Sequence, residues 1–215
     1  MDRPPEARRT QVDATKHYGP SYLGLPRLVV VWHQAKEVAK LVPDGGEVLE
    51  IGPGAGYTTF ILRAWGLRVT TMDLDPELNP DVVGDVTNPC FVADSFDCVL
   101  AAQVLEHIPF EEFETAVKEL ARITKRYVII TLPAPLIGLA GLLNAPSFSP
   151  VGFTVGLPYY VKHRFDGQHY WELGKRGSSV RDVRQKIARH LDIIDEFRPR
   201  LSLRCYFFVA RKRGG

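Results

Sequence analysis

The sequence predicts an α/β fold, in which a mostly parallel β-sheet carries helices on both faces and ends in an antiparallel pair of strands. Three observations predict it. Short apolar runs alternate with segments whose apolar residues recur at helical spacing. Residues 96–102 are nearly all apolar, which is typical of a strand buried on both faces. Residues 191–197 and 204–210 have no helical segment between them, so we expect them to pair antiparallel.

Glycine and proline bound the first predicted elements. Apolar residues over 28–42 have the spacing of a one-faced helix, and a Pro-Asp-Gly-Gly run ends it. A short apolar strand at 48–51 runs into a glycine cluster, and a helix is predicted over 57–65. Gly66 breaks that helix, and residues 67–73 are interpreted as a second strand.

The alternation continues through the middle of the chain. Residues 82–83 are a short strand candidate, and residues 96–102 form the strand described above. Residues 111–123 carry apolar side chains at helical spacing, and residues 127–131 are predicted as another strand. Strands that alternate with helices in this way predict right-handed crossovers and a mostly parallel sheet.

The pattern fails between residues 133 and 177. This stretch holds frequent glycine and proline together with seven aromatic residues, and we expect no regular element in it. A long aromatic segment of this kind is typical of a functional lid. Order resumes at Ser179, which with Asp182 forms a pattern like a capping box and begins a helix. The strands at 191–197 and 204–210 then complete the sheet.

Composition bounds the class of protein. The 215 residues, 45% hydrophobic and 24% charged, fit one domain, which we expect over residues 13–215 with an insertion at 133–177, behind a disordered tail at 1–12. Three widely spaced cysteines predict neither disulfides nor a zinc site, and we expect no metal. The polar start indicates no signal peptide, and the longest apolar run has only 12 residues, at 132–143. We therefore expect a cytoplasmic protein without a membrane span.

The net charge of +2 conceals a basic C-terminal part. Residues 172–215 contain 12 Lys and Arg against 5 Asp and Glu, a local charge of +7. Such a surface can attract an acidic substrate or nucleic acid. The alternative interpretation is a solvated helix face followed by a basic tail that aids solubility.

The most specific motif is the glycine loop that follows the strand at 48–51. Its sequence, Gly-Pro-Gly-Ala-Gly over residues 52–56, allows a ligand to approach the backbone and leaves N–H groups at the positive end of the next helix. The dinucleotide fingerprint G-x-G-x-x-G needs a third glycine where Tyr57 stands, which disfavours a nicotinamide oxidoreductase. The pattern is instead E-x-G-x-G-x-G, with Glu50 two residues before the first glycine.

This motif resembles the first motif of the class I S-adenosylmethionine (SAM)-dependent methyltransferases, and the resemblance continues in order to residue 132. Residues 69–76 resemble the family's second strand, which ends in the acid that accepts hydrogen bonds from both ribose hydroxyls. Residues 84–86 resemble the segment whose acid meets the adenine amino group, and residues 96–109 resemble the fourth strand and the turn after it. The resemblance implies a Rossmann-like sheet of seven strands and SAM as the cofactor.

The resemblance also implies which residues bind the cofactor across the carboxyl ends of the first, second and fourth strands. Asp73 is the ribose acid, whereas Asp75 precedes Pro76 and is predicted as a helix N-cap. Glu50 either orients the amino group of SAM or supports the loop, and Asp85 either meets the adenine or stabilises a turn. The residues expected to bind SAM are Glu50, Gly52, Pro53, Gly54, Gly56, Asp73, Leu74, Asp85, Val86, Ala102 and Gln103.

Histidine is the natural general base if the methyl acceptor is a hydroxyl or a protonated amine. His107 follows the fourth strand, where cofactor and acceptor should meet, and otherwise stabilises the turn. His163 and His169 lie in the aromatic insertion, where the alternative is a solvent-facing loop residue. His17 and Tyr22 belong to an N-terminal segment that is a further candidate for covering the cofactor.

The run of residues 169–174 is the most distinctive part of the insertion. Tyr170 and Trp171 are candidates for walls of an acceptor pocket, and Glu172 for positioning a donor group; equally, Trp171 is a candidate anchor of the insertion. We expect methyl transfer from SAM to an oxygen or nitrogen of a small molecule. The alternatives are a nucleic-acid or protein methyltransferase and a catalytically silent SAM-binding interaction module.

Overall fold

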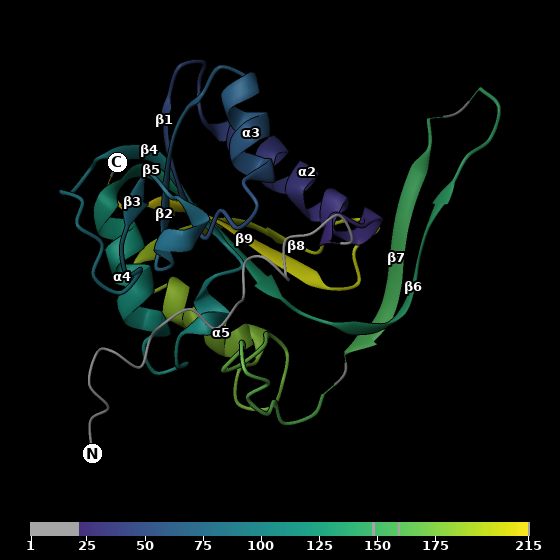
Figure 1. The fold of residues 1–215 in the computed structure, drawn as a ribbon. Coiled ribbons are helices and arrows are strands. Elements are labelled where there is room, and N and C mark those ends of the chain that lie inside the picture. Colours follow the sequence, from purple (N-terminus) through teal and green to yellow (C-terminus); the bar gives the residue numbers. More distant parts are fainter. Residues whose placement is uncertain (1–21, 148, 159, 215) are drawn as a thin grey trace.

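A seven-stranded sheet forms the centre of the molecule (Figure 1). The structure is a computed structural model that describes residues 22–147, 149–158 and 160–214. The strand order is β3-β2-β1-β4-β5-β9-β8, and only the pairs made by β9 are antiparallel. The strands are β1 (Glu47–Ile51), β2 (Arg68–Asp73), β3 (Val82–Val83), β4 (Phe96–Ala102), β5 (Thr124–Pro133), β8 (Leu191–Phe197) and β9 (Cys205–Lys212). The predicted Rossmann-like, mostly parallel sheet with an antiparallel final pair is confirmed.

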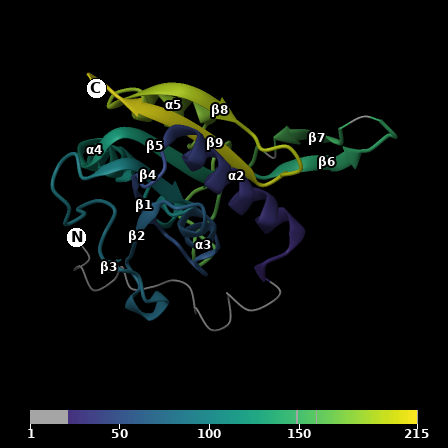
Figure 2. The same ribbon diagram turned by 90° about the horizontal axis from the view of Figure 1, so that it is seen from above.

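Helices cover both faces of this sheet, α2 and α3 on one side and α4 and α5 on the other (Figures 1 and 2). The buried strands are apolar on both faces for this reason. Along β4, Val99 and Ala101 pack in the core with α4 and α5, whereas Cys98 and Leu100 pack in the core with α2 and α3. The helices are α2 (Leu25–Leu41), α3 (Tyr57–Ala64), α4 (Phe113–Ile123) and α5 (Val180–Ile187), with the short 3-10 helices η3 (Pro76–Leu78) and η4 (Leu105–His107).

The start of α5 follows the predicted capping pattern. Ser179 is the N-cap residue, and its Oγ accepts a hydrogen bond from the backbone N–H of Asp182 at 3.2 Å while donating to the carboxylate of Asp182 at 2.7 Å. These bonds satisfy a backbone donor that the first helical turn cannot pair internally.

The insertion at residues 133–177 contains a regular element, so the prediction of an irregular segment is wrong for its first half. β6 (Leu136–Leu143) and β7 (Val151–Pro158) form an antiparallel hairpin that projects from the body of the molecule (Figures 1 and 2). Its large apolar side chains are mostly exposed; Leu139 and Leu157 expose 75% and 76% of their surface. This half of the insertion is an arm and does not cover the sheet.

The glycines of this arm are part of the strand pairing. Gly138 lies opposite Gly156, and a Cβ atom added to Gly138 would lie 2.1 Å from the carbonyl oxygen of Val155. The two backbones therefore approach more closely than side chains at this position would allow. Frequent glycine, which predicts a break in regular structure, here permits it.

Other predictions concern cysteines, membrane spans and the chain start. Cys98 and Cys205 are fully buried beneath α2 and α3 as small core residues, as predicted, and Cys90 is exposed. Among the described residues, no helix combines the length and the apolar character that crossing a bilayer requires. The predicted tail at 1–12 lies outside the described residues.

Candidate functional site

The carboxyl ends of three parallel strands meet at one edge of the sheet. In the register, Ile51 at the end of β1 pairs with Met72 of β2 on one side and with Ala101 of β4 on the other. The chain moves outward from β1 in one direction through β2 and β3, and in the other through β4 and β5. Such a reversal leaves a crevice beyond the strand ends, where doubly wound α/β proteins bind ligands.

The loop after β1 lies against the turn after β4. Gly52 has a φ of +75°, and a Cβ atom on it would lie 3.0 Å from Cβ of Val104 and 3.4 Å from the carbonyl oxygen of Ala102. Gly56, with a φ of +74°, is the N-cap of α3 and contributes no side chain, so the N–H groups of the first helical turn face outward from the loop. Pro53 and Gly54 lie between them. This loop has the backbone geometry of a ligand-binding helix start.

Glu50 lies one strand residue before Ile51 and is buried, with 1% of its surface exposed. Its carboxylate accepts a hydrogen bond from the hydroxyl of Thr59 on α3. Burial raises the pKa of Glu50 to about 7, although the Thr59 hydrogen bond and the charge of Arg63 act in the opposite direction. Glu50 therefore joins β1 to the helix that the glycine loop begins.

Asp73 closes β2 beside this loop. It is half-buried, and its Oδ1 accepts a hydrogen bond from the backbone N–H of Asp75 at 2.9 Å. Burial raises the pKa of Asp73, and the charge of Asp75 adds to that rise. Asp75 is the N-cap of η3, where it accepts from the N–H of Glu77 at 2.9 Å, as its sequence predicts. Leu74, between the two acids, is exposed.

Asp85 forms the turn that follows β3. Its Oδ1 accepts hydrogen bonds from the backbone N–H and the hydroxyl of Thr87, at 2.8 and 2.7 Å. This geometry is the turn role that the sequence left open for Asp85. Val86, the next residue, is buried in the core with α4 and α5.

Gln103 holds an unusual backbone conformation just beyond β4. Its φ is +54°, a left-handed value that is uncommon outside glycine. Its N–H donates to the backbone oxygen and to the hydroxyl of Thr131, both at 3.1 Å, and its side-chain oxygen accepts from Arg27 of α2. Two elements, β5 and α2, thus fix Gln103 next to the half-buried Ala102, and strained residues held in this way cluster at functional sites.

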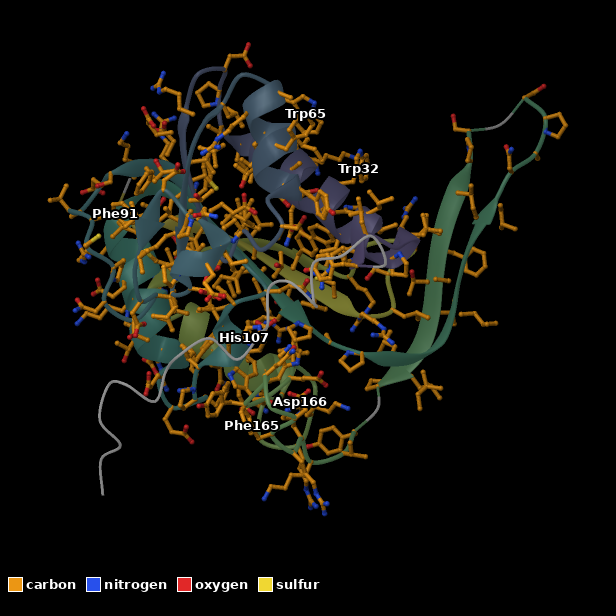
Figure 3. All side chains as sticks on the ribbon, viewed as in Figure 1. Trp32, Trp65, Phe91, His107, Phe165 and Asp166 are labelled. Carbon is orange, nitrogen blue, oxygen red and sulfur yellow. The ribbon has the colours of Figure 1, made fainter. Side chains whose placement is uncertain are left out.

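Residues 161–178, the second half of the insertion and the residue that follows it, pack against η4, and we call them the covering segment. Figure 3 shows His107 of η4 close to Phe165 and Asp166 of this segment. His107 Nδ1 lies 3.0 Å from the carbonyl oxygen of Gln168. Because a carbonyl only accepts, Nδ1 carries the proton and the neutral ring has its lone pair on Nε2. The rings of His107 and His169 stand edge to face with centroids 5.0 Å apart.

The other two predicted site histidines are held by acids of the covering segment. His169 Nδ1 lies 3.4 Å from Oε1 of Glu172 and 3.9 Å from Oδ2 of Asp166. Burial alone lowers the pKa of His169, but the Glu172 hydrogen bond and the charge of Glu106 raise it overall. His163 bonds through Nε2 to the carbonyl oxygen of His169 at 2.9 Å, and its Nδ1 lies 3.9 Å from Glu172.

Sequence reasoning missed Glu106, which precedes His107 in η4. Its surface is 1% exposed, and its Oε2 has no hydrogen-bond partner among the described residues. Burial raises the pKa of Glu106 to about 7, against the lowering effects of the charges on His169 and Arg27. The sequence signal was an acid directly before a histidine in the turn after a buried strand.

Trp171 anchors the covering segment to the core. Its surface is 4% exposed, its ring meets those of Phe110 and Phe113 edge to face, and its indole N–H donates to the carbonyl oxygen of Ile108 at 3.1 Å. The geometry therefore favours the anchor over an open pocket wall, the other role considered for Trp171. Tyr170 exposes 40% of its surface.

Of the two N-terminal candidates, His17 and Tyr22, the structure describes only Tyr22. His17 lies outside the described residues. Tyr22 lies beneath the guanidinium of Arg27, which is 4.6 Å from the centre of its ring. Burial raises the pKa of Tyr22, and the charges of Tyr57 and Glu106 also contribute, so Tyr22 lies near both the glycine loop and η4.

Comparison with known proteins agrees with this arrangement. Residues 49–131 match the family model of a methyltransferase domain, a range that contains the glycine loop, Asp73, Asp85 and η4. This match supports the resemblance of the sequence motifs to the class I SAM-dependent methyltransferases. SAM is the methyl donor of that family.

Solved structures share the fold of this chain. One is 1,6-didemethyltoxoflavin-N1-methyltransferase from Burkholderia thailandensis, solved with 1,6-didemethyltoxoflavin and S-adenosylhomocysteine; the TM-score is 0.65 at 16% identity, over 99% of this chain and 93% of that one. Another is the N-methyltransferase NodS from Bradyrhizobium japonicum, solved with S-adenosylhomocysteine, with a TM-score of 0.52 at 13% identity over 85% of this chain and 87% of that one.

A curated relative matches over a short stretch. Forty-two residues are 52% identical to a protein-L-isoaspartate O-methyltransferase from Chlorobium limicola, and the match spans 20% of this chain but only 19% of that protein.

Proposed function

We propose that this methyltransferase transfers the methyl group of SAM to an oxygen or nitrogen atom of a small molecule. The observation that carries the proposal is the meeting of three features at one sheet edge: the glycine loop after β1, the Asp73 carboxylate after β2, and the histidines beside the turn after β4. These features supply a place for a nucleoside and, next to it, polar groups for an acceptor.

The residues at this edge fit SAM. Gly52 leaves room that a Cβ atom would fill, and the start of α3 offers backbone N–H groups. We propose that Asp73 accepts hydrogen bonds from both ribose hydroxyls, because a carboxylate can take two donors at once in a charge-assisted arrangement. Glu50 lies in the adjacent strand β1, and Gln103 follows β4, the next strand of the sheet. The other residues that the sequence predicts to bind SAM complete the proposed cofactor site; they are Pro53, Gly54, Gly56, Leu74, Asp85, Val86 and Ala102.

SAM supplies a methyl group on a positively charged sulfur, so the protein needs mainly to hold the acceptor in line with it and exclude water. The covering segment, anchored by Trp171, lies against the turn after β4, and we propose that it keeps solvent from the acceptor. We propose that His107 and His169 lie beside the polar atom of the acceptor and help to position it. His163 faces a carbonyl group and Glu172, so we assign it to holding that acid in place.

Two further observations support a small acceptor. The covering segment lies close against η4, where the backbone N–H of Tyr170 donates to the carbonyl oxygen of Glu106 at 2.9 Å, and a segment held this close favours a small acceptor over a polymer. Two proteins of similar fold are named as N-methyltransferases, which supports nitrogen as the atom methylated. Free cysteines support a reducing, cytoplasmic compartment for the protein.

Calorimetry with SAM and S-adenosylhomocysteine tests the cofactor site. Asp73→Ala should weaken binding about 5- to 150-fold, equivalent to about 1–3 kcal/mol, because the hydroxyls lose their acceptor. Asp44→Ala, an exposed turn residue before β1, is the matched control and should bind as the wild type does. Equal affinity in Asp73→Ala and wild type would reject the ribose assignment. Mass spectrometry for a gain of one methyl group in candidate acceptors then tests the transfer.

A further inference from the structure

Three side chains at the turn after β4 lie close enough to share a metal ion. Glu106, His107 and His169 each offer one oxygen or nitrogen atom, and these atoms all lie within 4.8 Å of one another. Metal–ligand bonds of about 2.0–2.2 Å hold ligand atoms about 3.0–3.5 Å apart, so side-chain rotations of about an ångström would close the cluster.

The buried carboxylate of Glu106 indicates that a cation belongs here. Oε2 of Glu106 is buried without a hydrogen-bond partner among the described residues, and such a group is costly unless something pairs with it. The guanidinium of Arg27 lies near enough for its charge to lower the pKa of Glu106, but it donates to Gln103 and makes no hydrogen bond to Oε2 of Glu106. A bound metal ion would supply the missing partner.

The outer contacts of both histidines suit metal binding. His107 Nδ1 faces the carbonyl oxygen of Gln168 at 3.0 Å, and His169 Nδ1 faces the carboxylate of Glu172 at 3.4 Å. Each Nδ1 therefore carries a proton toward an acceptor, which places the lone pair of the neutral ring on Nε2. Metal-binding histidines have this arrangement, in which an outer oxygen fixes the orientation of the ring and increases its basicity.

We propose that Glu106, His107 and His169 bind a divalent transition-metal ion of the Zn²⁺ type. Two imidazoles and one carboxylate suit zinc and its first-row neighbours, whereas Mg²⁺ and Ca²⁺ prefer all-oxygen sites. Three protein ligands leave a coordination position open. The role of this site in catalysis rests on the proposed function. In that role, the open position takes an oxygen or nitrogen donor of the acceptor, so the acceptor is a molecule able to ligate a metal.

The sequence predicted no metal because the third ligand lies 62 residues after the second. Local metal motifs depend on short spacings between ligands. Here the covering segment brings His169 back to η4, and only the fold places the three residues together.

Metal content and calorimetry test this site directly. Protein treated with a chelator and then dialysed against Zn²⁺ should retain one ion per chain by elemental mass spectrometry. Glu106→Gln and His169→Ala should each weaken Zn²⁺ binding about 100-fold. His190→Gln, which removes a histidine paired with Glu114 outside the cluster, is the matched control and should bind as the wild type does.

The outcomes separate this inference from the proposed function. Glu106→Gln keeps the shape of the side chain, so it tests the site even if the alanine variant fails to fold. Zn²⁺ binding equal in wild type and Glu106→Gln, or absent from the wild type, overturns the metal site. If the wild type binds Zn²⁺ through Glu106 but does not bind S-adenosylhomocysteine, the metal site stands and the proposed function fails.

Discussion

When the buried carboxyl group of Glu50 is ionised, it lowers the stability of the ligand-free protein. It is buried in the sheet, its hydrogen bond comes from Thr59, and its pKa in the folded protein is raised to about 7. In the unfolded chain, the same group titrates near its ordinary value of about 4.3. Folding is therefore unaffected by this group below the unfolded pKa. Stability is lost as the pH rises through the folded pKa, because only the unfolded chain solvates the charge freely.

Glu50→Gln should remove this pH dependence. The free energy of unfolding of the variant, relative to the wild type, should increase by about 2 kcal/mol between about pH 5 and pH 8, since one unit of pKa shift corresponds to about 1.4 kcal/mol. Urea unfolding without cofactor, followed by circular dichroism at each pH, measures it. Glu111→Gln, at an exposed position, is the matched control and should follow the wild type. A difference that stays constant with pH would contradict the assignment to Glu50.

At the scale of elements, the β6–β7 arm is set apart from the rest of the domain. Both of its faces carry exposed apolar side chains, and isolated two-stranded hairpins have marginal stability in water. Its contacts with the body occur near the loop between β8 and β9, where the N–H of Leu136 donates to the carbonyl oxygen of Leu203 at 2.8 Å. The arm therefore adds little to the stability of the sheet.

Replacing residues 137–157 with a short Gly-Ser linker should leave the domain folded. We expect the free energy of unfolding to change by less than about 1 kcal/mol, because surface changes away from the core have small effects. Affinity for S-adenosylhomocysteine should be unchanged, since the proposed cofactor residues lie outside the arm. Chemical unfolding and calorimetry of the two proteins provide the comparison; an unfolded deletion variant would show that the arm supports the core.

The sequence predicted the sheet because its signals are local. Residues 96–102 are apolar since both faces of β4 are covered, and Ser179 begins α5 through contacts within one turn. The arm escaped prediction because frequent glycine predicts a break in regular structure, although the large apolar residues of β7 alternate with glycine and threonine. In Gly138 and Gly156, a residue type that usually breaks strands instead allows two strands to pair closely.

The candidate site, too, was predicted from sequence only in part. The glycine loop and Asp73 are recognisable because they follow directly from strand ends. Glu106 and His169 are joined only by the path of the covering segment, which no local pattern encodes. The sequence left two roles open for Trp171, a pocket wall and an anchor of the insertion. The packing of Phe110 and Phe113 around its ring favours the anchor.

At the scale of the whole molecule, ion pairs change how the basic C-terminal part is interpreted. Of the 12 cations in residues 172–215, six have an acid within 4 Å among the described residues. These paired cations are Lys175, Arg184, Lys186, Arg189, Lys212 and Arg213. A polyanion would have to compete with these acids for its contacts, which disfavours a nucleic-acid surface.

The full chain should accordingly bind nucleic acid weakly. A protein that neutralises about six to ten phosphates loses about 10³- to 10⁵-fold in affinity when the salt concentration rises from about 50 to 200 mM. A true nucleic-acid-binding surface therefore gives a steep salt dependence. We expect fluorescence anisotropy with a labelled RNA to show little binding at about 150 mM salt and a shallow slope below it. Asp192→Asn frees Arg213 and should raise the affinity at low salt. Tight wild-type binding with a steep slope would instead identify nucleic acid as the acceptor, in place of a small molecule.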